Sequence, residues 1–351
     1  MTIRGTYSQG FVVPQLNQLF GPPLNSNPYV VTPDDTVPTT DTNYFRPLAL
    51  QQNVYYISNP DVPPSTAETK TIGAVYSPKQ IKGLTISVDY YHIEQPQYNF
   101  IPSSSQMVAS LNANGTNSFY YNNPALHGTA VYLDQNNNPY VPTAGNTNTY
   151  ITALNFGTLN VPLLPGGSIR TDGIDFGLNY RIETKNWGIV DLFANANVLF
   201  SYDVKLGKGT PWLGYKGQYT DSQAVAAPQG MIPDYNITAG FTWSVYNFDY
   251  TVTAHYLPGV TDFGDLHPSV GAPSNDFTAN GKPWSVPDYY KIDMQLAYNF
   301  RSDAGKKWYD GTRLAVGVNN ITDNLPPLIA SSSEDNSDKS TYDILGRFVY
   351  F

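Results

Sequence analysis

The chain has 351 residues, enough for one large domain or two ordinary ones, and 13% of them are charged while 14% are aromatic. Soluble domains average about 25% charged residues, yet a mean hydropathy of -0.33 and the lack of any apolar run of about 18 residues exclude a protein built from membrane-spanning helices. A net charge of -9 without a basic stripe excludes nucleic-acid binding, and the absence of cysteine excludes disulfides and thiolate metal sites.

Ten segments alternate apolar with polar side chains, as strands do when their two faces meet different surroundings. In chain order they are residues 2–10, 67–77, 83–94, 168–183, 188–204, 235–245, 248–257, 287–300, 311–321 and 341–351. The clearest alternation sets Ile174, Phe176, Leu178, Tyr180 and Ile182 against Asp175, Gly177, Asn179 and Arg181. Each full-length segment is long enough, at about 9–11 tilted residues, to cross a bilayer.

We expect the apolar sets to face lipid and the polar sets to face a lumen. The sequence therefore predicts an all-β protein whose segments form the wall of an antiparallel transmembrane β-barrel. The abundance of tyrosine, 28 residues, suits the aromatic girdles of such barrels. An extracellular β-sandwich or lectin is the alternative, because such proteins are also rich in Tyr, Asn and Thr.

The connections between these segments alternate in length. Short ones lie near 78–82, 184–187, 246–247 and 302–310, and long ones at about 11–66, 95–167, 205–234, 258–286 and 322–340. Outer-membrane barrels have short periplasmic turns and long extracellular loops, which here would leave Phe351 in the periplasm. The long connections are rich in Asn, Pro, Gly, Ser and Thr, so we expect turns in them rather than helices.

No metal or cofactor site is predicted. The histidines are His92, His127, His255 and His267, and no two of them have the spacing of zinc ligands. His92 continues the outward register, whereas His255 falls in the lumenal register, where we expect it to be hydrogen-bonded. The segment Asp134–Asn138 resembles a calcium loop, but Pro139 stands where the required glycine should be, so a plain turn is favoured.

No catalytic residue is predicted either. Asp172 with Asp175, and Asp288 with Asp293, could be carboxylate pairs for acid–base chemistry, but no nucleophile or histidine accompanies them in the sequence. Hydrogen bonding in the lumen is the better interpretation. No nucleophile elbow, phosphate-binding loop or dinucleotide fingerprint occurs. We therefore expect a protein that is not an enzyme.

Aromatic residues in the long connections are the candidate ligand-binding groups, because their rings stack on sugars or flat chelates. The candidates are Tyr120, Tyr121, Tyr132, Tyr140, Trp212, Tyr215 and Trp284. The alternative for any one of them is loop packing, or a place in the outer aromatic girdle.

Several blocks follow one another in a characteristic order: Gly10–Phe20, Ser65–Lys70 with Gly73–Tyr76, Lys82–Tyr91, Thr171–Phe176, Val316–Asp323 and Tyr342–Arg347. In this order they resemble the C-terminal part of the barrel of TonB-dependent outer-membrane receptors. The most recognisable block is Thr171–Phe176. The last two blocks resemble the penultimate strand and the opening of the terminal strand. Val12 and Val13 replace the family's usual Arg and Ala.

The resemblance implies that residues 1–351 are one barrel domain, the C-terminal portion of a barrel of about 22 strands, without plug, TonB box or early strands. The intact receptor would bind a scarce extracellular ligand of the siderophore, cobalamin or oligosaccharide class. TonB would act through the missing plug, and the other partners would be outer-membrane lipid and the ligand at the extracellular loops. The implied location is the outer membrane of a Gram-negative-type bacterium.

The two ends carry further expectations. Met1–Tyr7 lacks the apolar region and cleavage site of a signal peptide, so we expect a fragment, a truncated reading frame or a mature segment.

One alternative function is a self-contained ten-stranded pore or adhesin. It requires residues 2–10 to pair with 341–351, because unpaired strand edges are costly in lipid. A soluble carbohydrate-binding β protein is a weaker alternative.

Overall fold

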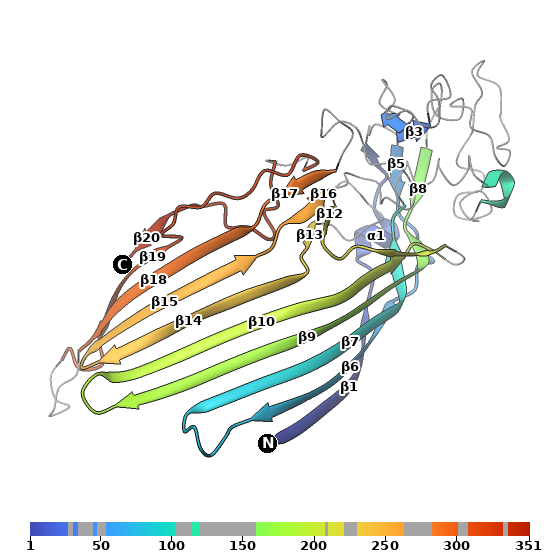
Figure 1. Cartoon of the computed structure of the whole chain (residues 1–351). Helices are drawn as coiled ribbons and strands as arrows, with labels where there is room; N and C mark the ends of the chain where they lie inside the picture. Colours follow the sequence, from blue (N-terminus) through green and yellow to red (C-terminus); the bar gives the residue numbers. More distant parts are fainter. Residues whose placement is uncertain are drawn as a thin grey trace.

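A computed structural model describes residues 1–26, 31–33, 45–47, 54–102, 114–118, 159–207, 210–220, 230–262, 283–300, 308–332 and 336–351. One antiparallel sheet dominates it, and its strands lie side by side in chain order (Figure 1). The path is β1 (Thr2–Val12), β6 (Ser65–Tyr76), β7 (Leu84–Phe100), β9 (Leu164–Thr184), β10 (Gly188–Lys205), β14 (Tyr235–Val245), β15 (Phe248–Leu257), β18 (Tyr289–Asn299), β19 (Arg313–Asn319) and β20 (Phe348–Tyr350). These strands correspond one to one with the ten predicted segments.

Shorter elements lie in the long connections. They are β2 (Leu24–Ser26), β3 (Val31–Pro33), β4 (Phe45–Pro47), β5 (Val54–Ile57), β8 (Leu159–Pro162), β11 (Trp212–Gly214), β12 (Gln218–Thr220), β13 (Gly230–Ile232), β16 (Val260–Asp262), β17 (Trp284–Val286), helix α1 (Leu16–Phe20) and the 3-10 turn Gly115–Asn117. The expectation of turns without helices is wrong at α1 and at Gly115–Asn117. Helix α1 forms because the Gln18 side chain accepts a hydrogen bond from the Gln15 backbone N–H (2.9 Å) and caps its start.

The register confirms that alternate residues form two different faces. Directly opposed residues of neighbouring strands share a face. One rung of the apolar face consists of Val88, Phe176, Ala196, Ile237, Tyr256 and Tyr290. The next rung, on the polar face, consists of Asp89, Asp175, Asn197 and Asn236. The predicted assignment of the side chains to two faces therefore holds across these strands.

The apolar face is uncovered by the described residues. Phe176 is 37% exposed, Leu296 is 44% exposed and Leu314 is 62% exposed. A soluble sandwich would bury these side chains between two sheets. A continuous exposed apolar surface of this kind needs another covering, which in a barrel wall is lipid.

The buried core lies at one end of the sheet rather than along its wall. One cluster joins the ends of β7, β9 and β10 to the connections and comprises Phe100, Val161, Leu164, Val204, Leu206, Leu213 and Tyr215. A second cluster comprises Tyr219, Met231, Val260, Val286, Tyr289, Ile329 and Tyr342. Both stabilise the end of the sheet at which the long connections emerge. No helix in the described ranges is long and apolar enough to span a membrane.

Two glycines allow aromatic rings to lie flat on the polar face. A Cβ at Gly173 would stand 2.2 Å from the Tyr91 hydroxyl oxygen, and one at Gly317 would stand 2.3 Å from the Tyr350 ring. Tyr91 is in register with Gly173, and Tyr350 with Gly317. A larger residue at either glycine would displace the ring.

The C-terminal segment differs from its prediction. A strand was expected over 341–351, but only β20 is extended, and residues 341–347 belong to the connection from β19. We call the described residues 320–332 and 336–347 the strap. Asp338 holds it in turns by accepting hydrogen bonds from the Met231 backbone N–H (3.0 Å) and the Thr341 hydroxyl (2.8 Å), and these bonds compete with sheet pairing.

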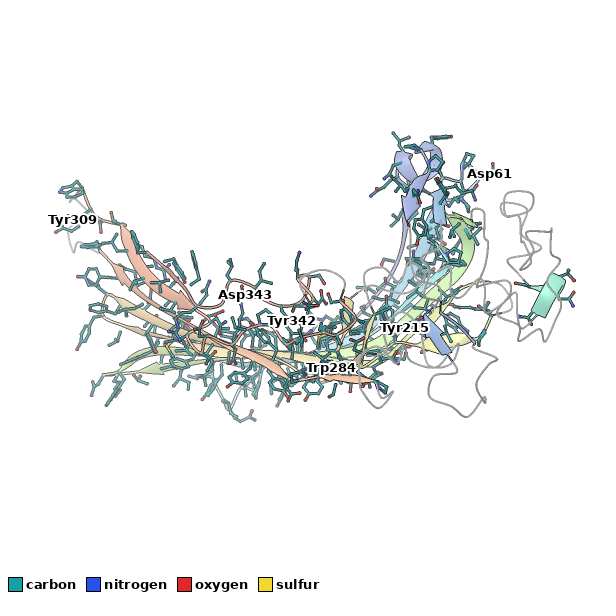
Figure 2. The ribbon with its side chains drawn as sticks, turned by 90° about the horizontal axis from the view of Figure 1, so that it is seen from above. Asp61, Tyr215, Trp284, Tyr309, Tyr342 and Asp343 are labelled. Atoms are coloured by element: carbon teal, nitrogen blue, oxygen red, sulfur yellow. The ribbon has the colours of Figure 1, made fainter. Side chains whose placement is uncertain are left out.

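The sheet is curved and open. Figure 2 shows Tyr342 and Asp343 of the strap over its concave side. Since Asp343 accepts a hydrogen bond from Lys291 of the polar face (3.0 Å), the concave side is the polar face. β1 and β20 stand at the two ends of the strand order, and among the described residues they do not pair with each other. The closure required by a self-contained ten-stranded barrel is therefore not seen.

An arginine scan across the two faces tests this arrangement. Leu178→Arg places a charge on the apolar face near the middle of β9 and should reduce the free energy of unfolding from lipid vesicles by about 2–4 kcal/mol. Asn179→Arg, one residue on and facing the lumen, should cost much less. Equal losses for the two variants, measured by equilibrium denaturation, would contradict the assignment of faces.

Candidate functional site

The concave polar face carries two adjoining hollows. The first has a volume of about 640 Å³ and lies over β1, β6, β7, β9, β10 and β14. The second has a volume of about 700 Å³ and lies between β14, β15, β18 and the strap. Asn236 and Thr238 line both hollows, so the two form one continuous trough. Its size falls within the usual range for small-molecule sites.

The first hollow is lined by polar groups that are mostly paired with one another. Arg4 of β1 donates from Nε to Asp89 Oδ1 (2.7 Å) and makes a second contact through Nη2 to Oδ2. Asn197 donates from Nδ2 to Asp175 (2.9 Å) and to the Tyr91 hydroxyl (3.0 Å). Fork-like arginine–carboxylate pairs of this kind fix the geometry of both partners.

The second hollow has charged groups centred on Lys291 and several neutral polar groups. Lys291 Nζ lies 3.0 Å from Asp343 Oδ2 of the strap and 3.9 Å from Asp293. His255 lies on the polar face as predicted, with Nδ1 3.1 Å from the Thr238 hydroxyl and Nε2 3.3 Å from Asp293. The cationic Lys291 therefore has carboxylate partners on both the wall and the strap.

The strap forms one wall of the second hollow and is anchored at several points. The Tyr342 ring packs edge-on against Tyr289 at 5.1 Å, and Ser331 donates its hydroxyl to Asp262 (2.6 Å). The Lys291 ammonium donates to the Asp343 carboxylate, which holds the pKa of that carboxyl below its ordinary value. The Tyr289 hydroxyl is buried without a hydrogen-bond partner among the described residues. Burial of a hydroxyl group without a hydrogen bond is unfavourable. It therefore reduces the free energy cost of moving the strap away from Tyr289.

The predicted aromatic ligand-binding residues are only partly described. Tyr120, Tyr121, Tyr132 and Tyr140 lie outside the described residues. The Trp212 ring is stacked by the Arg170 guanidinium at 4.4 Å. Trp284 donates from its indole nitrogen to the Leu328 carbonyl of the strap (3.1 Å). Tyr215 is only 2% exposed inside the first core cluster, so a ligand could contact it only if that cluster opened.

The four carboxylates predicted to lie in the lumen divide between the two faces. Asp175 and Asp293 lie on the polar face, but Asp172 has the register of Ile174 and lies on the apolar face, where it accepts a hydrogen bond from Tyr90 (2.5 Å). Asp288 precedes β18 and accepts from the Tyr256 hydroxyl (2.6 Å). The prediction is therefore wrong for Asp172 and Asp288, because successive residues of a strand alternate faces and Asp172 is an odd number of residues from Asp175.

His92 contacts the carboxylate of Asp172. Its Nδ1 lies 2.8 Å from Asp172 Oδ1 on the apolar face, consistent with the outward register predicted for it. Within the described part of the chain, no three His, Cys, Asp or Glu side chains are grouped so that they could hold a metal ion. The Asp134–Asn138 segment lies outside the described residues.

Sequence reasoning missed the residues that line the trough. Asn236, Thr238 and Lys291 belong to strands, and their polar register marked them only as facing the lumen. The strap residues Ser340, Thr341 and Asp343 were assigned to the terminal strand or the loop before it. A signal was present in the cluster of Ser, Asp and Thr around Asp338, which favours turns over a strand.

Comparisons with known proteins agree with this geometry. A family model described as TonB dependent receptor-like, beta-barrel matches residues 1–321. No curated protein sequence matches the chain. Among solved structures, a variant of the ferric enterobactin receptor of Pseudomonas aeruginosa in complex with enterobactin is similar, with 11% identity, 99% of this chain and 37% of that chain covered, and a TM-score of 0.54. The siderophore receptor PirA of Acinetobacter baumannii is similar at 15% identity, with 99% and 38% covered and a TM-score of 0.54.

Because the sequence identities are low, these similarities show the fold of the chain and nothing beyond it. The chain spans less than two fifths of the length of either receptor.

The strap can be tested through its ion pair with Lys291. Because the folded-state pKa of Asp343 is depressed, the stabilisation it provides is present above the ordinary carboxyl pKa of about 3.9 and is lost as pH falls through the lower folded value. The protection of residues 338–345 from hydrogen exchange, taken relative to the intrinsic exchange rate at each pH, should therefore be high at pH 7 and fall only below about pH 4 in the wild type. Lys291→Met should lower this protection already at pH 7.

The control is Arg181→Met. Arg181 contacts Glu183 at 3.2 Å and Asp191 at 3.5 Å on the same face, toward the opposite end of the strands. This variant should leave strap exchange unchanged. Unchanged exchange in Lys291→Met would show that the ion pair does not anchor the strap.

Proposed function

Because the chain belongs to the TonB-dependent receptor-like β-barrel family, we propose that it forms part of the wall of an outer-membrane receptor that takes up a scarce extracellular ligand. Uptake would be energised by TonB. The observation that carries the proposal is the rung pattern, in which Val88, Phe176, Ala196, Ile237, Tyr256 and Tyr290 follow one another across β7 to β18 on one face, and polar side chains form the next rung on the other.

Within such a receptor, residues 1–351 would be the C-terminal portion of the barrel domain. The long connections would lie outside the cell and the short turns, with Phe351, in the periplasm. The trough and the aromatic residues of the long connections, including Trp212 and Trp284, would meet the ligand. The chain would contribute wall and ligand contacts, whereas coupling to TonB would belong to a plug.

The ligand classes compatible with the family are siderophores, cobalamin and oligosaccharides. The two similar structures are siderophore receptors, but at such low sequence identity they indicate only the fold of this chain. A passive pore remains the alternative mechanism, and it differs from the proposed one in needing no energy from TonB.

Epitope insertion tests the orientation. A tag between Asn137 and Asn138, in the longest connection, should bind antibody on intact cells. The same tag between Lys185 and Asn186, in a short turn, should bind only after the outer membrane is permeabilised. The reverse pattern would overturn the orientation, and labelling of neither tag in the outer-membrane fraction would overturn the location.

Uptake assays test the mechanism. Ferric tris-catecholate, cyanocobalamin and maltotriose, each radiolabelled, serve as probes of the three ligand classes. Accumulation of at least one of them should fall to background when the gene is deleted, and equally when TonB is deleted. Loss in the gene deletion with normal uptake in the TonB deletion would favour a passive pore instead.

A further inference from the structure

The short turns and the long connections carry opposite net charge. Six Lys and Arg but only two acidic residues occur in the four turns at 77–83, 185–187, 246–247 and 300–312. Sixteen acidic residues but only six Lys and Arg occur in the five connections at 13–64, 101–163, 206–234, 258–288 and 320–347. The turns after β6, β9 and β14 lie at the end of the sheet away from the connections (Figure 1). We call this end, with its surplus of positive charge, the turn end.

Three cations of the turn end are presented to the surroundings. Lys79 and Lys82 lie between β6 and β7, Lys185 lies between β9 and β10, and all three residues are exposed. Glu183, the carboxylate closest to Lys185 in the sequence, contacts Arg181 instead (3.2 Å). Each of these four strands has a neighbour on both sides, so the exposure of the two turns does not depend on further strands of the wall.

Large aromatic side chains accompany these lysines. Trp187 is 70% exposed and Tyr246 is 91% exposed. The Trp243 indole nitrogen donates to the Trp187 carbonyl (2.6 Å), and Trp243 belongs to the apolar face, in register with Val190. The turn that carries Lys185 is therefore joined directly to the outward-facing wall. Tyr and Trp are the side chains that favour the level of the lipid headgroups, because one part of the ring is apolar and the other is polar.

Tyr246 has an unfavourable backbone conformation. It is the first residue of the two-residue turn between β14 and β15, and its φ is 53°. Gly, Asn and Asp adopt positive φ readily in such turns, whereas bulky residues do not. A residue that departs from this preference and also exposes its ring indicates a position where the side chain serves another purpose. Contact with the membrane interface is such a purpose.

The other end of the outward face has a different balance of charge. Lys70 is in register with His92 of the apolar face and contacts Glu68 (3.7 Å). Arg170 lies two residues from Asp172, on the same face, and contacts Asp203 (2.9 Å). These two cations have carboxylate neighbours on the wall itself, so an anion approaching that end meets charges of both signs.

We propose that the turn end binds anionic phospholipid headgroups through Lys79, Lys82 and Lys185, with the rings of Trp187 and Tyr246 in the interface beside them. Clustered lysines attract the phosphate of an anionic lipid, whereas the cation of a zwitterionic headgroup offsets its phosphate. The orientation proposed above makes the contacted leaflet the periplasmic one. The inference rests on the assignment of the apolar face to lipid, and it is independent of any transported ligand.

Lipid selectivity tests the proposal on the protein purified from outer membranes and reconstituted into phosphatidylcholine vesicles. Electron paramagnetic resonance of spin-labelled phosphatidylglycerol and spin-labelled phosphatidylcholine gives the ratio of their association with the wall. At low ionic strength the ratio should favour phosphatidylglycerol about threefold, and it should fall toward one as salt is raised. The triple variant Lys79→Gln, Lys82→Gln and Lys185→Gln should show a ratio near one even at low ionic strength.

The matched control changes three lysines toward the connection end, Lys70→Gln, Lys205→Gln and Lys216→Gln, and alters the net charge equally. It should keep the wild-type ratio. A wild-type ratio near one, a turn-end triple variant that keeps its preference, or a control that loses it would overturn the proposal. Failure of the proposed function is distinct from these results, because it would be seen as absence from the outer-membrane fraction or as uptake that is independent of TonB.

Tyr246→Asn tests the role of the exposed ring. Asn suits a positive φ better than Tyr does, so a ring without a role predicts that the variant resists denaturant better than the wild type. A ring that lies in the membrane interface predicts the opposite, because its contact with lipid is lost. We expect a lower denaturation midpoint in vesicles that contain phosphatidylglycerol. An unchanged or higher midpoint would overturn the role assigned to Tyr246.

Discussion

The structure depends on one requirement: every backbone N–H and C=O group of a strand in hydrocarbon needs a partner on a neighbouring strand. The long strands meet this requirement by pairing in chain order, so that each strand from β6 to β19 has a neighbour on both sides. A sheet that is continuous in this way has two surfaces and no interior. Stability then comes from lipid on one face and from side-chain contacts on the other. The buried core of the protein lies at the end of the sheet.

The polar face shows how the second surface is stabilised. Arg4 and Lys291 are held by carboxylates, Gly173 and Gly317 are covered by the rings of Tyr91 and Tyr350, and amides and hydroxyls contact one another across strands. Such pairing keeps a lumen polar without leaving isolated charges.

The strands were predictable because their pattern is local and repeated. Period-two alternation over ten or more residues, as in Ile174–Ile182, requires no knowledge of long-range contacts. The strap was not predictable in this way. Tyr342 and Ile344 mimic a strand's alternation, but Asp338 and Asp343 bind to Met231 and Lys291, more than fifty residues away. The prediction for Asp172 was wrong because its acidic side chain was expected to face the lumen, whereas its position in the strand places it on the apolar face.

The candidate site divides along the same line. Aromatic residues in the connections could be named from composition alone, but their surroundings depend on tertiary packing: Tyr215 lies in a core cluster and Trp212 beneath Arg170. Asn236 and Thr238 could be placed on the polar face from sequence. Their position where two hollows meet follows from the curvature of the sheet and the path of the strap, which no local pattern contains.

The central claim is that successive residues of these strands meet lipid and water in turn. The chain has no cysteine, so single cysteines placed at each position from 173 to 182 of β9 can carry a nitroxide without background labelling. Collision with oxygen, which concentrates in lipid, and with a water-soluble nickel chelate should alternate with a period of two residues, oxygen being favoured at Ile174, Phe176, Leu178, Tyr180 and Ile182. Equal access of the nickel chelate to both sets of positions would contradict the account.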